Sequence, residues 1–239
     1  MHRIRPLLER ADRFIGPALI EKVPRDHRES DAAFRRRRLV VAVVLVFGAT
    51  LLGISLSVEP GAASFYWLTL ALAATWVVGG FLSGPLHLGR IGWRGTLRRP
   101  VITPIVLGLL AAALFVAGAL VVREIGPLRD YVRTVLDHAS QGSLPLVLGV
   151  TLLNGLAEEV FFRGALFAAI GTRAPVVIST VVYALATVAT RNPMLIFAAL
   201  TLGLIFGLQR RASGGVLASM LTHVTWSAAM VLLLPPLFS

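Results

Sequence analysis

Two adjacent glutamates and an arginine, Glu158, Glu159 and Arg163, lie inside an apolar stretch that runs over residues 144–170. The other acidic residues fall in the N-terminal region or in the connections between apolar stretches. Because ionised groups are costly in hydrocarbon, those inside a membrane span usually face the interior of a helix bundle and mark function. The triplet therefore predicts a functional site within a membrane domain.

Helical spacing separates the two glutamates. Glu159 and Arg163 are four residues apart and share a helix face, so they can form an ion pair in a low-dielectric interior. Glu158 points about 100° away from that face in an α-helix. A partly desolvated carboxylate without such a partner is a better general base near neutral pH. We predict that Glu158 activates a water molecule that attacks an amide.

Two further apolar spans supply polar side chains at a similar depth. His223 is the only histidine within an apolar span, and Ser227 follows it by one helical turn. Both can donate hydrogen bonds to a developing oxyanion. At ~1.5 Å per residue, Thr187 and His223 reach the depth of Glu158 in antiparallel helices. Asn154, one turn before Glu158, is expected to orient its carboxylate.

Each of these side chains also has a purely structural explanation. Glu159 and Arg163 would then be an ion pair between helices, and Glu158 would be a protonated core carboxyl. His223 would be a neutral packing residue. We expect Thr187 to donate to the carbonyl of the residue four positions earlier in its own helix.

The composition indicates a membrane protein. Of the 239 residues, 56% are hydrophobic and only 15% are charged, which is more apolar surface than a soluble domain of this size can bury. The absence of cysteine excludes disulfides and thiolate chemistry. The net charge of +11 does not indicate nucleic-acid binding, because the arginines flank apolar spans. There they set topology and contact anionic headgroups of the lipid bilayer.

The fold class is therefore predicted to be an all-α polytopic membrane protein, a bundle of about seven transmembrane helices. The expected spans cover residues 39–58, 64–83, 101–122, 144–170, 175–190, 194–208 and 214–234. An eighth membrane element inside residues 84–100 or 123–143 is left open. Residues 123–143 are also compatible with a short surface helix.

The arginines predict the orientation. Arg35 to Arg38 precede the first span and place the N-terminus in the cytoplasm by the positive-inside rule. The basic loop over residues 90–99, the turn with Arg173 and the pair Arg210-Arg211 then fall on the same side. The chain uses arginine almost to the exclusion of lysine, which suggests a high-GC bacterial genome and hence a multi-pass plasma membrane protein.

Residues 1–38 form the predicted cytoplasmic tail. Apolar residues recur in it at roughly helical spacing: Leu7, Leu8, Phe14, Ile15, Leu19 and Ile20. A short helix on the membrane surface and a solvated tail are both compatible with this pattern.

The motif from Glu158 to Arg163 resembles the Glu-Glu-x-x-x-Arg motif of the CPBP family. That family comprises CAAX prenyl-protein endopeptidases, related bacterial membrane proteases and bacteriocin-immunity proteins. Tyr183-Ala-Leu-Ala-Thr187 stands where the family has Phe-x-x-x-His, and His223-Val-Thr-Trp-Ser227 where it has His-x-x-x-Asn. The resemblance covers residues 144–234, and Tyr183 is expected to be a core packing residue.

The resemblance implies an intramembrane endopeptidase that acts on a membrane-associated protein or peptide. Glu158 would activate the water, Glu159 and Arg163 would hold the site in place, and His223 would help to form the oxyanion site. Residues 39–143 would be three N-terminal transmembrane helices with their loops, and residues 144–239 the catalytic core.

Two departures from the family pattern favour an alternative function. Thr187 replaces a histidine and Ser227 replaces an asparagine. Threonine donates one hydrogen bond but cannot carry a proton at neutral pH, and a missing electrostatic donor commonly costs about a hundred-fold in rate. The alternative is a catalytically impaired relative that acts as a membrane scaffold or an immunity-type protein. A proton- or ion-coupled transporter is disfavoured, because the chain lacks matching repeated halves.

No cofactor is expected. Zinc sites use three or four ligands, and only Glu158, Glu159 and His223 are available. The two glutamates point to different sides of their helix. A divalent metal such as zinc on these three residues remains the alternative prediction.

Overall fold

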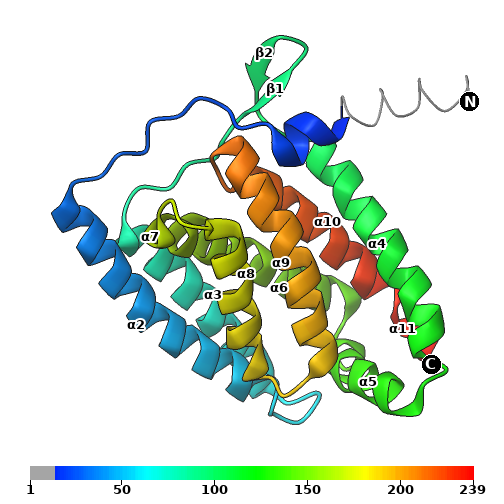
Figure 1. Cartoon of the computed structure of the whole chain (residues 1–239). Coiled ribbons are helices and arrows are strands. Elements are labelled where there is room, and N and C mark those ends of the chain that lie inside the picture. The colour runs from blue at the N-terminus through cyan, green and yellow to red at the C-terminus, as the bar shows by residue number, and fades with distance from the viewer. Residues whose placement is uncertain (1–13) are drawn as a thin grey trace, which may run out of the picture.

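Seven apolar helices pack side by side in the computed structural model, which describes residues 14–239 (Figure 1). Five of them are long and apolar enough to cross a membrane: α2 (Asp31–Ser55), α3 (Ala63–Ser83), α4 (Ile102–Val122), the continuous helix Leu144–Ile170 and α9 (Pro193–Ser213). Two are shorter, α8 (Pro175–Val188) and α10 (Leu217–Leu233). They correspond one to one to the seven predicted spans. The protein is an all-α multi-pass membrane protein.

The first span begins earlier than predicted. Helix α2 starts at Asp31, where the side chain of Ser30 accepts a hydrogen bond from the amide of Ala33 and caps the helix. The arginine tetrad at residues 35–38 therefore belongs to the first turns of α2, and the predicted tail over residues 1–38 includes helix. Arginine is a good helix former, so α2 begins within this polar sequence and not at the first apolar residue.

The two connections left open by the sequence contain no eighth apolar helix. Residues 84–100 carry a two-stranded hairpin, with β1 (Ile91–Trp93) antiparallel to β2 (Thr96–Arg98). The other connection forms α5 (Gly126–Ser140), which confirms the predicted short helix. A short terminal helix, α11 (Pro235–Phe238), follows α10.

One end of the bundle gathers the arginine-rich segments. Arg37 is 1% exposed, and its guanidinium pairs with Glu29 and donates to the Ser83 hydroxyl at 3.1 Å and to the Pro85 carbonyl at 3.3 Å. These bonds join the start of α2 to the end of α3. The β1–β2 hairpin and residues 14–30 lie at this end as well (Figure 1).

The opposite end holds α5 and α11 (Figure 1). There, the Nε2 atom of His138 in α5 lies 2.9 Å from the Val58 carbonyl, and Asn192 donates to the Tyr131 carbonyl at 2.7 Å. The basic loops and the less basic connections thus lie at opposite ends, as the positive-inside pattern requires. The orientation of the bundle in a membrane stays a prediction.

Residues 14–30 cross the arginine-rich end. The predicted helix in this region is a single π-helical turn, η1 (Gly16–Ile20), within the described residues, and Leu7 and Leu8 lie outside them. The amide of Val23 donates to the carbonyl of Ala212 in α9 at 3.2 Å. The segment is therefore docked on the helix ends.

A pair of stacked histidines completes this docking. The rings of His27 and His87 lie 3.8 Å apart and nearly parallel, at 6°. Burial, together with the positive charges nearby, lowers the pKa of His27 to about 4 and lowers the pKa of His87. Both rings are thus held in the uncharged form in which they can stack.

The main core lies between α2, α3 and residues 159–166. The ring of Trp76 in α3 is 1% exposed and contacts the rings of Phe161 at 4.5 Å and Phe162 at 5.1 Å. On its other side, the indole lies against the backbone of Gly48 in α2, where a Cβ atom would overlap the ring. The close approach of α2 and α3 depends on that missing side chain.

Substituting Gly48→Ala is expected to destabilise the protein by about 1–3 kcal/mol, because the enclosed Trp76 ring has no room to move. Gly118→Ala is the matched control, since nothing lies within 4 Å of the Cβ position of Gly118. Thermal unfolding in detergent micelles measures both. Equal unfolding temperatures for the two variants would contradict the packing argument.

Acidification is expected to weaken the docking of residues 14–30. The folded-state pKa of His27, about 4, lies below its ordinary value of 6.5, so the unfolded chain binds more protons at low pH. The stability contributed by the uncharged ring is full above pH 6.5 and is lost as the pH falls toward 4. The double variant His27→Phe/His87→Phe keeps a ring pair without titration. Its unfolding temperature should fall less than that of the wild type over this range, and identical pH profiles would disprove the assignment.

Candidate active site

Glu159 and Arg163 lie on a π-helical segment, and Glu158 is the residue directly before it. The continuous span Leu144–Ile170 consists of α6 (Leu144–Glu158), the π-helix η2 (Glu159–Leu166) and α7 (Phe167–Ile170). All eight residues of η2 are buried. The predicted α-helical register therefore holds only as far as Glu158. Insertions of π-helix in α-helices are frequent at functional sites.

A buried side chain accounts for the change of register. Arg210 of α9 is 6% exposed, and its Nε atom donates to the Arg163 carbonyl at 2.7 Å. A side chain that inserts into the backbone ladder of a helix distorts it locally. Nothing in the spacing of apolar residues signals this contact.

The predicted ion pair is present. Nη1 of Arg163 lies 2.9 Å from Oε1 of Glu159, and both side chains are fully buried. The guanidinium carbon of Arg163 lies 4.6 Å from the ring centre of Tyr183 and 5.0 Å from that of Phe206. The two aromatic faces support the cation where water cannot reach it.

His223 joins this pair. Its Nδ1 atom lies 3.2 Å from the same Oε1 atom of Glu159, and its ring packs on Phe206 with centroids 4.9 Å apart. The ring also lies against the backbone of Gly155 in α6, where a Cβ atom would be 3.4 Å from it. The second ring nitrogen of His223 has no hydrogen-bond partner within residues 14–239, so it is available to a substrate group.

Glu158 is held by a different residue, which the sequence did not indicate. The hydroxyl of Tyr183 donates to Oε2 of Glu158 at 2.5 Å. Tyr183 packs against the core, as expected, with its ring 4.6 Å from that of Phe162, and its hydroxyl adds a bond that was not predicted. The sequence feature that could have predicted this bond is the hydroxyl itself, because a tyrosine inside an apolar span normally needs a hydrogen-bond partner.

Three other polar residues that were predicted to lie near Glu158 make no hydrogen bond to either glutamate. Thr187 donates to the carbonyl of Tyr183 at 2.9 Å in its own helix, as expected from its spacing. Ser227 is buried and makes no side-chain hydrogen bond in the described part of the chain. Asn154 donates to the Val150 carbonyl at 3.0 Å, so the prediction that it orients Glu158 is wrong.

The acidic and imidazole groups do not form a cluster suited to a metal ion. Among residues 14–239, no group of three or more His, Cys, Asp or Glu side chains is arranged to hold one. Oε1 of Glu159 is already shared by Arg163 and His223, while Glu158 is bonded to Tyr183. The alternative set of Glu158, Glu159 and His223 therefore does not fit zinc, which takes three or four convergent protein ligands.

In the comparison with known proteins, a family model matches the C-terminal part of the chain. Residues 140–229 match the family model described as type II CAAX prenyl endopeptidase Rce1-like. No curated protein and no solved structure matches the chain. The matched range contains the glutamates, Arg163, Tyr183 and His223, and it confirms the resemblance to the CPBP family.

The buried ion pair is expected to dominate the stability of this region. Arg163→Met would leave Glu159 charged with only His223 as a partner, at a cost of about 3–5 kcal/mol. Adding Glu159→Gln removes that charge and should recover most of the loss in thermal unfolding. A double variant as unstable as Arg163→Met alone would show that packing of the guanidinium, and not its charge, stabilises the fold.

Proposed function

We propose that this chain, whose residues 140–229 form an Rce1-like domain, is an intramembrane endopeptidase that uses a glutamate-activated water. The substrate class is a membrane-associated protein or peptide. The observation that carries the proposal is the difference between the two glutamates. Glu159 is fully buried in the Arg163–His223 cluster, whereas Glu158 is half-buried and has Tyr183 as its hydrogen-bond partner.

In this proposal Glu158 is the general base. Its Oε2 atom is bonded to the Tyr183 hydroxyl, which leaves Oε1 to accept a proton from a water molecule. The hydroxide attacks the carbonyl carbon of the scissile amide and forms a tetrahedral oxyanion. Glu158 then returns the proton to the leaving nitrogen, so the proton balance closes without a second acid.

His223 is proposed to stabilise the oxyanion. With Nδ1 directed at Glu159, an imidazolium would be supported by that carboxylate and could donate from Nε2. Glu159 and Arg163 act as positioning residues, because they hold the ring of His223 and the register of η2. No step requires a metal ion or another cofactor.

The proposal includes the membrane in which the protein lies and its orientation there. The arginine-rich end of the bundle would face the cytoplasm, with the N-terminus on that side, in a bacterial plasma membrane. The site would open toward the cytoplasm, where a protein substrate reaches the bilayer surface.

A second function is favoured by one specific observation. The hydroxyl of Thr187 is bonded within its own helix, and Ser227 contributes no hydrogen bond to the site within residues 14–239. Thr187 and Ser227, which stand where the family has histidine and asparagine, therefore give Glu158 no donor. This supports the alternative of an impaired relative that serves as a membrane scaffold or immunity-type protein.

Glu158→Gln is expected to abolish cleavage of a prenylated CAAX peptide by the protein reconstituted in liposomes, with folding and insertion intact. Tyr183→Phe should retain activity reduced by about 10- to 100-fold, since it removes one hydrogen bond to the base. Glu59→Gln, in the turn at the other end of the bundle, is the control and should keep the wild-type rate. An active preparation that keeps its rate with Glu158→Gln would exclude this mechanism.

Thr187→His distinguishes the two functions if the wild-type protein shows no turnover. Restoring the family's histidine should then create measurable cleavage, provided that the rest of the site is intact. Cleavage in that variant alone, lost again on adding Glu158→Gln, would mark a decayed protease. Without any gain, the scaffold function would be the better account.

A further inference from the structure

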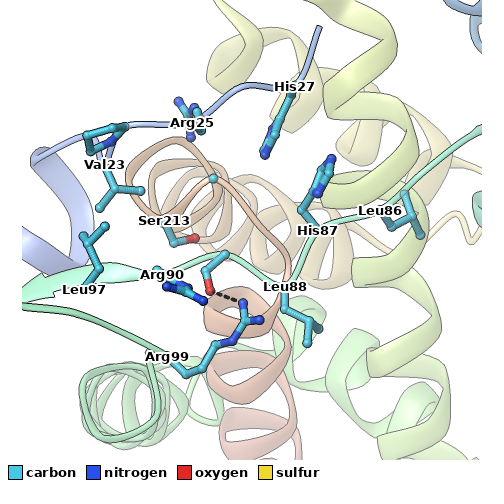
Figure 2. A pocket seen from close by; sticks show the side chains of 13 residues that line it. Val23, Arg25, His27, Leu86, His87, Leu88, Arg90, Leu97, Arg99 and Ser213 are labelled. Carbon is cyan, nitrogen blue, oxygen red and sulfur yellow. Dashed lines mark hydrogen bonds between the residues drawn. The ribbon is translucent and has the colours of Figure 1, made fainter. Parts of the chain in front are cut away.

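A pocket of about 430 Å³ opens at the arginine-rich end of the bundle, outside the candidate active site. It is formed by the docked N-terminal segment, the connection between α3 and α4, and the turn between α9 and α10. The lining residues are Val23, Pro24, Arg25, His27, Leu86, His87, Leu88, Gly89, Arg90, Leu97, Arg99, Ser213 and Gly214. Figure 2 shows the arginines around the pocket and the two histidine rings facing each other.

The pocket has a strong excess of positive charge. Arg25, Arg90 and Arg99 line it, and none of the lining residues within 14–239 is acidic. The side chains of Arg25 and Arg90 make no hydrogen bond or ion pair in the described part of the chain. Arg99 donates one hydrogen bond to the Gly89 carbonyl, at 2.6 Å. A guanidinium has five N–H donors, so further donors of Arg99 remain.

A further buried cation adds to this potential. The charge of Arg210 in α9 is among the causes that lower the pKa of both His27 and His87, after burial. Arginines that converge without a carboxylate partner repel one another. A bound anion relieves that repulsion, and the planar donors of arginine match phosphate oxygens.

The position of the pocket indicates which kind of anion it would bind. Ser213 is the last residue of α9, and Leu86 lies three residues after the end of α3 at Ser83. The ends of membrane-spanning helices lie at the level of the lipid headgroups. Leucines at positions 86, 88 and 97 provide apolar surface beside the arginines. The site therefore combines cations with apolar contacts at headgroup height.

We propose that this pocket binds a phosphate group between Arg25, Arg90 and Arg99, either in the headgroup of an anionic phospholipid or as free phosphate. The bound group would also fasten residues 14–30 to the helix ends, because Arg25 comes from that segment while Arg90 and Arg99 come from the connection between α3 and α4. The site is separate from the residues of the proposed endopeptidase and is testable without its activity.

Two binding experiments on the purified full-length protein test the site and identify the source. Delipidated protein in detergent is mixed with equal amounts of phosphatidylglycerol and phosphatidylcholine, and the retained lipids are counted by native mass spectrometry. In parallel, inorganic phosphate is titrated against the thermal unfolding temperature. Arg25→Gln/Arg99→Gln is the test variant, and Arg28→Gln/Arg98→Gln is the control with the same change in net charge in the same two segments.

The wild type and the control should prefer phosphatidylglycerol over phosphatidylcholine, and the test variant should lose that preference by about ten-fold. Preference for the lipid identifies a headgroup, whereas stabilisation by inorganic phosphate without lipid preference identifies free phosphate. If neither ligand binds, the proposal is wrong. An equal loss in the two variants would overturn it too, since it would indicate a nonspecific basic surface.

Discussion

The structure depends on one interaction, the ion pair between Glu159 and Arg163 in a region with no access to water. Both side chains have 0% exposure, and Oε2 of Glu159 and the Nε and Nη2 atoms of Arg163 have no hydrogen-bond partner within residues 14–239. The pair is instead supported by side chains that pack around it from three elements. The rings of Tyr183 and Phe206 cover the guanidinium, and His223 shares the carboxylate oxygen. Helices α8, α9 and α10 therefore pack around this ion pair and enclose it.

This arrangement gives the two glutamates different environments although they are neighbours in sequence. The pair fixes Glu159 and turns Glu158 toward α8, where the Tyr183 hydroxyl meets it. Tyr183 is in turn positioned by Phe162, whose ring packs on Trp76 of α3. The carboxylate that we propose as the general base is thus oriented by the aromatic core of the N-terminal helices. Spans with no functional motif contribute to the site through packing.

Much of the fold and part of the site follow from the sequence. Hydropathy locates seven helices, the four-residue spacing predicts the Glu159–Arg163 pair, and the chemistry of threonine predicts that Thr187 bonds its own helix. The contact between Tyr183 and Glu158 is invisible to such patterns, because it joins two helices whose rotation depends on packing. The docking of residues 14–30 is equally hidden, since its main determinants are a buried arginine and two stacked rings.

The π-helical segment η2 connects the candidate active site with the arginine-rich end of the bundle. A register change leaves helical carbonyls without their usual partners, and inside a membrane each such group must be satisfied by protein. Arg210 satisfies the Arg163 carbonyl from α9, and its charge also acts on the histidines of the basic pocket. The same buried cation therefore holds the helix that carries the glutamates and contributes to the potential at the arginine-rich end.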